Sequence, residues 1–228
     1  MEKDLNRLEE TIRYRFNDRA LLKQALVHPS YSGEMKLQRY ESNQRLEFLG
    51  DAVLELAVSE YLYKAHPMVE EGELTRKRSS LVFETALEVC ARSIGLGDYL
   101  YLGHGEDISR GREKPSILSD AFEAVIGAVY VDGGFEAACR FIDRFVIEQV
   151  DELALLKDGK SLIQEYVQRD VGGMLEYRTE ALAGPDHMKS FHSELYINQE
   201  LAAEGYGHSK KNAEQDAARK ACISLKLV

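Results

Sequence analysis

The chain has 228 residues, 44% of them hydrophobic and 30% charged, so it is long enough to bury a core in one large domain or two smaller ones. It has only four prolines and no low-complexity tract, and we therefore expect nearly all of it to fold. The formal net charge is −10, and after residue 157 nine Lys and Arg stand against eleven Asp and Glu. Neither part is basic overall, which taken alone argues against nucleic-acid binding.

The N-terminal segment and the most apolar segment argue against a secreted or membrane protein. Residues 1–14 are charged and carry Leu5, Leu8 and Ile12 at helical spacing, so we expect them to join the fold and not to form a signal peptide. Residues 121–131 are too few to cross a bilayer and include a glutamate. We therefore expect no membrane association.

The cysteines point to a reducing compartment. Cys90, Cys139 and Cys222 are far apart and form no CxxC pair, which favours buried thiols over disulfides or a zinc site. We therefore expect a cytoplasmic protein.

The spacing of apolar residues predicts a run of helices over residues 1–152. After a first helix around Leu5–Ile12, the predicted helices cover residues 20–27, 44–64, 74–94, 116–131 and 135–156. Asn17 or Asp18 is expected to cap the second helix, and Gly133–Gly134 to separate the last two. The glycine-rich residues 103–115 predict a mobile loop.

The period changes towards the C-terminus. Residues 161–169 predict a helix, residues 175–182 and 191–197 alternate as strands do, and a third strand is expected over 200–205. The turn between the first two strands is expected at residues 184–186, and a last helix at 210–227. The predicted architecture is an all-α domain over residues 1–152, a linker over 153–157 and a small α+β domain of order α-β-β-β-α over 158–228.

Two pairs of acidic residues stand out within the helical part. Glu47 and Asp51 are four residues apart, and Asp120 and Glu123 are three apart, so each pair lies on one face of its helix. Carboxylates set among apolar residues repel one another unless they protonate, pair with cations or bind a metal, and magnesium suits such oxygen ligands. Ordinary surface charges are the alternative. A di-iron or HExxH zinc site is not indicated, because no Glu-x-x-His or HExxH pattern occurs.

The residues around these pairs resemble the ribonuclease III family. Asn43–Leu54 (NQRLEFLGDAVL) resembles the signature helix of that family. Three further segments resemble it in the same order, namely Ala25–Tyr31 (ALVHPSY), Glu70–Thr75 (EEGELT) and Ser116–Ala124 (SILSDAFEA).

The resemblance implies an endonuclease for double-stranded RNA. Carried over by position, it implies that Glu47, Asp51, Asp120 and Glu123 hold catalytic Mg²⁺, with Mn²⁺ able to substitute, and that Asp51 and Glu123 are closest to the chemistry. It implies products with 5′-phosphate and 3′-hydroxyl ends. It also implies a homodimer, whose signature helices meet at a two-fold interface, and no organic cofactor.

Two positions near the acidic residues are further candidates. The family usually has Glu where this chain has Gln44, and a glutamine binds a cation less strongly but can orient a water or a ribose. Gln44 is therefore a possible active-site residue outside the metal set. Glu71 matches an acidic position near the family's active-site valley and is a second possible active-site residue.

The C-terminal part resembles a double-stranded-RNA-binding domain. The segment Gly205–Ala218 (GYGHSKKNAEQDAA) resembles its third contact region, where Lys210 and Lys211 at a helix N-terminus meet phosphates. Gln164 and Gln168, and His187 in the loop of residues 184–187, match the other two contact regions. This local basic face reconciles an acidic chain with RNA binding. The other candidate histidines, His28, His66, His104 and His192, are interpreted as structural.

The resemblance covers essentially the whole chain and predicts a bacterial-type ribonuclease III that processes ribosomal RNA precursors and other structured transcripts. The alternative is a protein that binds double-stranded RNA and has lost cleavage, acting as a regulator or assembly factor. The four intact carboxylates favour the enzyme, and only Gln44 favours the alternative.

Overall fold

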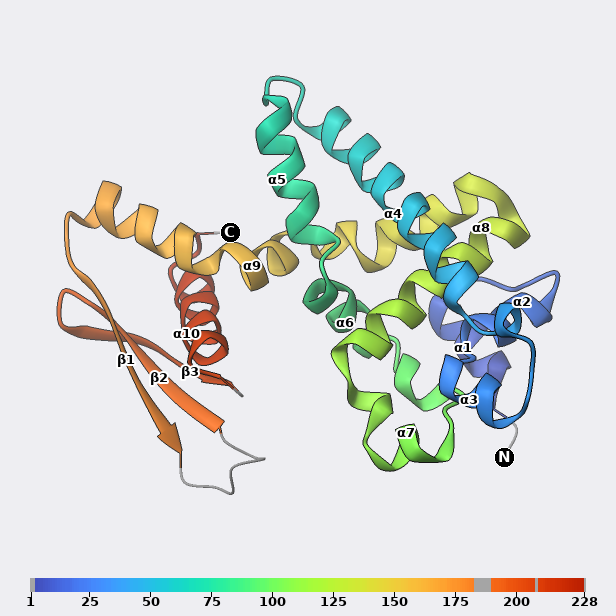
Figure 1. The fold of residues 1–228 in the computed structure, drawn as a ribbon. Helices are drawn as coiled ribbons and strands as arrows, with labels where there is room; N and C mark the ends of the chain where they lie inside the picture. Colours follow the sequence, from blue (N-terminus) through green and yellow to red (C-terminus); the bar gives the residue numbers. More distant parts are fainter. Residues whose placement is uncertain (1–2, 183–189, 208, 228) are drawn as a thin grey trace. The chain divides into compact units, whose positions relative to one another are not determined.

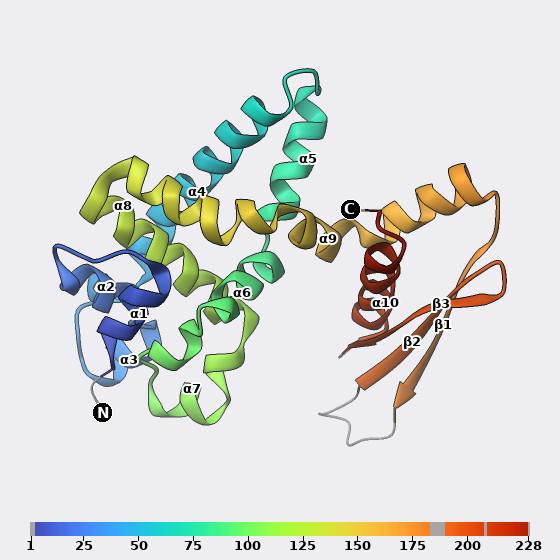
Figure 2. The ribbon, with the colours of Figure 1, turned by 180° about the vertical axis from the view of Figure 1, so that it is seen from behind.

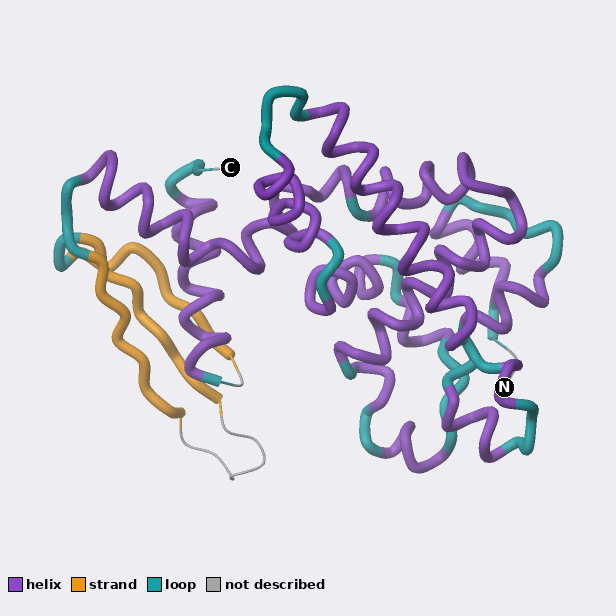
Figure 3. Tube along the Cα trace, turned by 45° about the horizontal axis from the view of Figure 1, so that its top comes forward, coloured by secondary structure: helices purple, strands orange, loops and turns teal. Residues whose placement is uncertain are grey.

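The computed structural model describes residues 3–182, 190–207 and 209–227, and the chain divides into two compact units, Met1–Val150 and Asp151–Val228 (Figure 1). Among the described residues all strands belong to the second unit (Figure 3). This agrees with the predicted order of an all-α part followed by an α+β part. No helix in these ranges has the length and apolarity to cross a bilayer.

The first unit consists of helices joined by short turns. The helices are α1 (Leu5–Ile12), α2 (Arg19–Ala25), α3 (Pro29–Glu34), α4 (Gln44–Ala65), α5 (Glu71–Leu81), α6 (Glu84–Ser93), α7 (His104–Ile108) and α8 (Pro115–Phe145). Single 3₁₀ turns cover Arg39–Glu41, Leu96–Tyr99, Gly111–Glu113 and Ile147–Gln149.

Helix α8 is the centre of this unit. Its first half is apolar on almost every side, as expected for a helix enclosed by others, and Phe122 and Ile126 are fully buried. Helices α2, α4 and α6 pack against it. The kink of α8 lies at Gly134, where the backbone leaves the helical region with φ 77°. The predicted break at Gly133–Gly134 is thus a bend inside α8.

The start of α2 is fixed to α8 by one carboxylate. Asp18 caps α2 by accepting a hydrogen bond from the backbone N–H of Ala20, which confirms the predicted cap. Asp132 of α8 accepts hydrogen bonds from the hydroxyl of Tyr14 (2.7 Å) and from the backbone N–H groups of Asn17 and Asp18 (3.0 and 2.9 Å). The N-terminal segment is therefore part of the fold, as expected.

Two predicted elements of the first unit are wrong. The single helix expected over residues 74–94 is two helices, because the chain becomes extended at Phe83 and lets α5 pack against α4 and α6 against α8. The loop expected over 103–115 contains α7 and a 3₁₀ turn. Ion pairs of Arg112 with Asp107 and of Lys114 with Glu106 hold this segment together.

The end of the helical part also differs from the prediction. The helix expected over residues 135–156 ends at Phe145, and after the 3₁₀ turn α9 (Val150–Tyr166) begins. Residues 153–157, predicted as a linker, therefore lie inside a helix. The exact borders of the two domains remain a prediction.

The second unit has the predicted order of helix, three strands and helix. A π-helical turn over Val167–Val171 follows α9, and then come β1 (Leu175–Leu182), β2 (Ser190–Ile197), β3 (Glu200–Gly207) and α10 (Lys210–Ser224). The sheet is antiparallel in the order β1-β2-β3, and α10 packs on one of its faces (Figure 2). The predicted turn at 184–186 lies outside the described residues.

The core of the second unit lies between the sheet and the helices. Leu195 of β2, Ile163 of α9 and Ala217 and Cys222 of α10 are fully buried. Helix α10 can approach β3 because Gly205 has no side chain, since a Cβ there would collide with the backbone of Ala213 and Ala217. This contact positions the N-terminus of α10.

Candidate active site

Helices α4 and α8 cross with their backbones in contact. A Cβ atom on Gly50 of α4 would collide with the carbonyl oxygen of Glu123 and lie 2.9 Å from the amide nitrogen of Gly127. A Cβ atom on Gly127 would in turn collide with the carbonyl oxygen of Leu46. Two glycines thus allow this close approach. The contact between the helices offsets the destabilising effect of Gly50 in mid-helix.

Three of the predicted carboxylates meet beside this crossing. Glu47 lies three residues before Gly50, and Glu123 lies four residues before Gly127, so both carboxylates leave their helices about one turn before the contact. Carboxylate oxygens of Glu47, Asp120 and Glu123 all lie within 4.8 Å of one another, and each side chain is half-buried. The structure therefore gathers three acidic groups from two helices in one place.

Burial and mutual repulsion oppose negative charge in this cluster. Loss of solvent, followed by the charges of Asp51, Asp120 and Glu47, raises the pKa of Glu123 to about 8. Loss of solvent is also the main cause of the raised pKa of Glu47, with Asp120 and Asp51 adding to it. Among the described residues, no cation pairs with Glu47 or Glu123 to offset these effects.

Asp51 and Glu84 border the cluster. Asp51 is exposed, although the sequence sets it among apolar residues, and its charge contributes to the raised pKa of both Glu47 and Glu123. Glu84, the first residue of α6, contributes after desolvation to the raised pKa of Asp120. The sequence pattern does not single out Glu84, because it joins this neighbourhood only through the packing of α6 on α8.

The cluster has the chemistry of a site for a hard divalent cation. Within the described ranges, none of the ion pairs involves Glu47, Asp51, Asp120 or Glu123. All of the available donors are carboxylate oxygens, which suit Mg²⁺ or Mn²⁺ better than softer metals. The residues present therefore fit such an ion.

The two further candidates lie outside the cluster. Gln44 is the exposed first residue of α4 and precedes Glu47 by one helical turn. Glu71 is the exposed first residue of α5, and its carboxylate accepts a hydrogen bond from the hydroxyl of Thr75 at 3.4 Å. Neither side chain is among the three that gather within 4.8 Å.

The start of α10 presents the predicted basic residues. Ser209 caps the helix, its hydroxyl accepting a hydrogen bond from the backbone N–H of Asn212 at 3.1 Å. Lys210 and Lys211 follow in the first turn and are exposed, and they make no ion pair within the described ranges. Free ammonium groups and unpaired backbone N–H groups at a helix start favour binding of phosphate.

The other predicted RNA contacts are placed only in part. Gln164 is exposed on α9, whereas Gln168 is exposed in the π-helical turn that ends this helix. The spacing predicted that both residues lie on one regular α-helix, and the structure does not place them so. His187 lies outside the described residues.

Family models match both units. Residues 18–150 match the model described as Ribonuclease-III-like, and residues 160–225 match the double-stranded RNA binding motif. The first match covers more than half of the chain and includes all four predicted metal-binding carboxylates.

Full-length relatives and a solved structure agree with these matches. Ribonuclease 3 of Anoxybacillus flavithermus is 46% identical, over 92% of this chain and 90% of that protein. Ribonuclease 3 of Pelotomaculum thermopropionicum is also 46% identical, over 98% and 94%. The nuclease domain of ribonuclease III from Campylobacter jejuni has a TM-score of 0.60 and 41% identity, covering 64% of this chain and 97% of that domain. The chain therefore belongs to the ribonuclease III family of endoribonucleases that act on double-stranded RNA.

Proposed function

We propose that this chain hydrolyses phosphodiester bonds of double-stranded RNA with Mg²⁺ held by Glu47, Asp51, Asp120 and Glu123. The observation that carries this proposal is the gathering of carboxylates without a partner cation at the α4–α8 crossing. An additional family feature, the double-stranded RNA binding motif, supplies the substrate class. We propose Mn²⁺ as a substitute for Mg²⁺, because it takes the same oxygen ligands.

The side chains of the site have different proposed roles in the reaction. Bound Mg²⁺ would lower the pKa of a coordinated water and neutralise charge on the phosphate. Glu47, Asp51, Asp120 and Glu123 would hold the cation, and of these Asp51 and Glu123 would lie nearest to the reacting phosphate. The water oxygen joins phosphorus and loses a proton, while the bond to the 3′ oxygen breaks and that oxygen takes up a proton, which leaves 5′-phosphate and 3′-hydroxyl ends. Gln44 orients a water or a ribose through its amide.

The second unit binds the duplex by its shape. Lys210 and Lys211 hold phosphates across the narrow major groove, and Gln164 and Gln168 donate hydrogen bonds to 2′-hydroxyl groups in a minor groove. His187 is proposed to enter the next minor groove. Because these contacts reach backbone and ribose, the chain selects duplex RNA over other nucleic acids with little regard to sequence.

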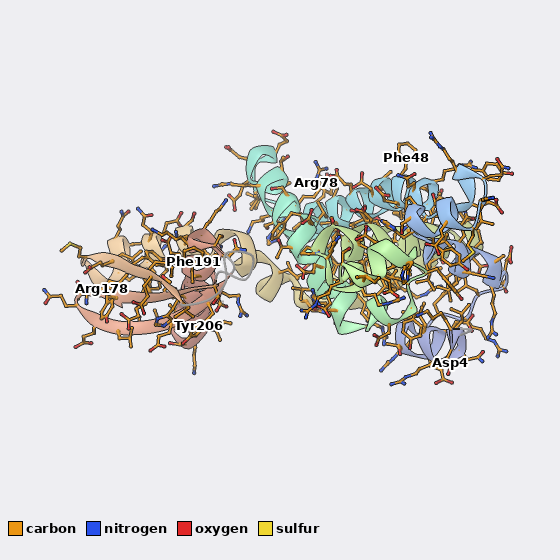
Figure 4. All side chains as sticks on the ribbon, turned by 60° about the horizontal axis from the view of Figure 1, so that its bottom comes forward. Asp4, Phe48, Arg78, Arg178, Phe191 and Tyr206 are labelled. Atoms are coloured by element: carbon orange, nitrogen blue, oxygen red, sulfur yellow. The ribbon has the colours of Figure 1, made fainter. Side chains whose placement is uncertain are left out.

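The active form is proposed to be a homodimer. Phe48 and Leu56 on α4 are 79% and 57% exposed, and Figure 4 shows the Phe48 side chain projecting away from the helix. Exposed apolar residues of this size mark interaction surfaces. In the Campylobacter jejuni relative, the nuclease domain has a region involved in dimer formation. A two-fold dimer through α4 would present one carboxylate cluster to each RNA strand, and Glu71 would lie at the edge of the resulting groove.

The cellular role is proposed to be processing of ribosomal RNA precursors and other structured transcripts in the cytoplasm. The bacterial relatives named ribonuclease 3 support this role. The three free cysteines suit a reducing compartment.

The first experiment incubates the purified chain with a long uniform RNA duplex in Mg²⁺, in Ca²⁺ or in chelator. Cutting to short duplexes with 5′-phosphates in Mg²⁺ alone is the expected result. Tight binding without cutting in every condition would overturn the catalytic proposal and favour a protein that only binds RNA. In that case cleavage by the Gln44→Glu variant would identify Gln44 as the cause.

A further inference from the structure

The outer face of the sheet in the second unit carries a group of charged side chains that are not among the proposed RNA contacts. Ser193 and Leu195 of β2 are buried on the side of α10, so the alternating residues His192 and Glu194 point to the opposite face. Residues at the same level on β3 share that face, among them Glu204, which pairs with Glu194. This face is separate from the start of α10.

Three side chains on this face are close enough to share one ion. The ligand atoms of His192, Glu194 and Glu204 all lie within 4.8 Å of one another. The Nε2 atom of His192 is 3.2 Å from a carboxylate oxygen of Glu204, and its Nδ1 atom is 3.8 Å from Glu180 of β1. Two residues come from one strand at spacing i, i+2, and the third lies directly across, which is the spacing at which a sheet brings side chains together.

The imidazole of His192 is held in a fixed place. Its ring stacks on the ring of Tyr206, with centroids 4.8 Å apart and planes inclined by 27°. The His192 side chain is only 14% exposed, although it lies on the outer face. A ligand whose ring is already packed loses little conformational entropy when it binds an ion.

The carboxylate of Glu194 is not paired with the arginine opposite it on β1. Glu194 and Glu204 are direct cross-strand partners, a like-charge arrangement that weakens a sheet. Arg178 lies opposite Glu194 on β1, but its guanidinium binds Glu176 and lies over the Tyr196 ring, 4.1 Å from its centroid. Figure 4 labels Arg178 and Tyr206 on this unit. In the described part of the chain, no ion pair involves Glu194.

We propose that His192, Glu194 and Glu204 form a second metal site, for a zinc-class cation. One imidazole and two carboxylates suit Zn²⁺ or Co²⁺, whereas Mg²⁺ disfavours an imidazole ligand. The cluster at the α4–α8 crossing offers only oxygen, so the two sites select different metals. The ion at the second site would relieve the repulsion between Glu194 and Glu204 and join β2 to β3.

The test is a zinc titration of the full chain carrying Asp120→Asn and Glu123→Gln, which disables the carboxylate cluster of the first unit. Zinc uptake is measured by competition with a colorimetric chelator, in excess Mg²⁺ and without an affinity tag. One zinc per chain is expected. Adding either His192→Gln or Glu204→Gln is expected to lower the affinity at least about tenfold.

The matched control is Glu176→Gln, which removes the same charge from the same face at a residue already paired with Arg178. It is expected to leave zinc affinity unchanged. Duplex RNA binding and far-UV circular dichroism verify that each variant is folded. The imidazole NMR signals of His192 should shift on zinc addition. Zinc affinity equal in the His192→Gln, Glu204→Gln and parent chains, or no zinc uptake, would overturn the proposal and leave a network of solvated ion pairs.

Discussion

Glu123 is the carboxylate on which the charges of its neighbours converge. Burial and the charges of Asp51, Asp120 and Glu47 raise its pKa to about 8. Between pH 4.5 and about 8 the folded chain therefore holds a proton at Glu123 that the unfolded chain has released. Without metal, the free energy of unfolding falls as pH rises from the ordinary pKa of 4.5 towards 8. A cation at this place removes the penalty.

Replacing Glu123 with Gln should separate catalysis from binding and stability. Glu123→Gln is expected to lower cleavage about a hundredfold or more, because it removes a charge that acts on the reacting centre. Duplex binding in a mobility-shift assay should persist, because the proposed RNA contacts of Lys210, Lys211, Gln164 and Gln168 lie in the second unit. In chelator at pH 8 the melting temperature should rise by about 2–4 °C, and at pH 4.5 it should not change.

The control for this substitution is Glu136→Gln, which changes an exposed residue of the same helix. It should leave cleavage and melting unchanged. Parallel loss of RNA binding and of cleavage in Glu123→Gln would show that Glu123 is structural.

At the residue scale, family resemblance predicted which acidic side chains to consider but not their surroundings. The structure brings Glu47, Asp120 and Glu123 together, and their roles remain a prediction. The exposure of Asp51 depends on how α4 packs on α8, and the nearness of Glu84 depends on how α6 packs on α8. The spacing along one helix does not contain either. His192 was interpreted as structural, because the pairing of β2 with β3 that brings Glu204 to it is not contained in the spacing along one strand.

Among the elements, the contact between α4 and α8 is the one on which the carboxylate cluster depends. Gly50→Ala is expected to destabilise the fold by about 1–3 kcal/mol, because the added methyl group meets backbone atoms that cannot rotate away. Cleavage should fall further than stability alone explains, since the helices must separate. Chemical denaturation and cleavage rates at a temperature where the variant is folded would measure both effects.

Gly72→Ala is the matched control, since a Cβ on Gly72 meets nothing within 4 Å. It should be neutral or stabilise by up to about 1 kcal/mol through helix propensity. Equal stability of the Gly50→Ala and parent chains would show that the two helices tolerate a wider separation.

The start of helix α10 is predicted to contribute to the affinity for duplex RNA. The double substitution Lys210→Ala and Lys211→Ala is expected to weaken duplex binding at least about tenfold and to reduce the slope of log affinity against log salt by about two. Lys220→Ala is the control, because Lys220 lies on the same helix but is paired with Asp216 at 2.8 Å. Equal losses in both variants would contradict a contact specific to the helix start.

The elements themselves were largely predictable, and the failures have a common cause. Strong patterns such as those of α4, β1 and α10 gave nearly correct bounds. Apolar periodicity continues across residues 82 and 83, where the two halves of the predicted helix turn to different partners, so the break between α5 and α6 was missed. Glycine content suggested a loop where the ion pairs around α7 stabilise a helix.

At the scale of the whole molecule, the exposed side of α4 predicts the oligomeric state. Phe48→Glu is expected to convert the dimer to a monomer, because a buried, unpaired carboxylate would be costly at the interface. Light scattering coupled to size-exclusion chromatography measures the mass, and cleavage should fall with dimer content. Ile108→Glu is the control, as Ile108 is 71% exposed but lies on α7. A Phe48→Glu chain that remains dimeric would place the interface elsewhere.

The crossing of Gly50 and Gly127 also bears on the timing of metal exchange. Because the two backbones are in contact, neither helix can slide or rotate without a collision, and the carboxylates stay together whether or not an ion is bound. Binding of a cation would then require the ion to shed water and Glu123 to release its proton, but it would not require the helices to rearrange. On the proposed function, a chain without metal would therefore keep its site assembled and regain cleavage when magnesium is added.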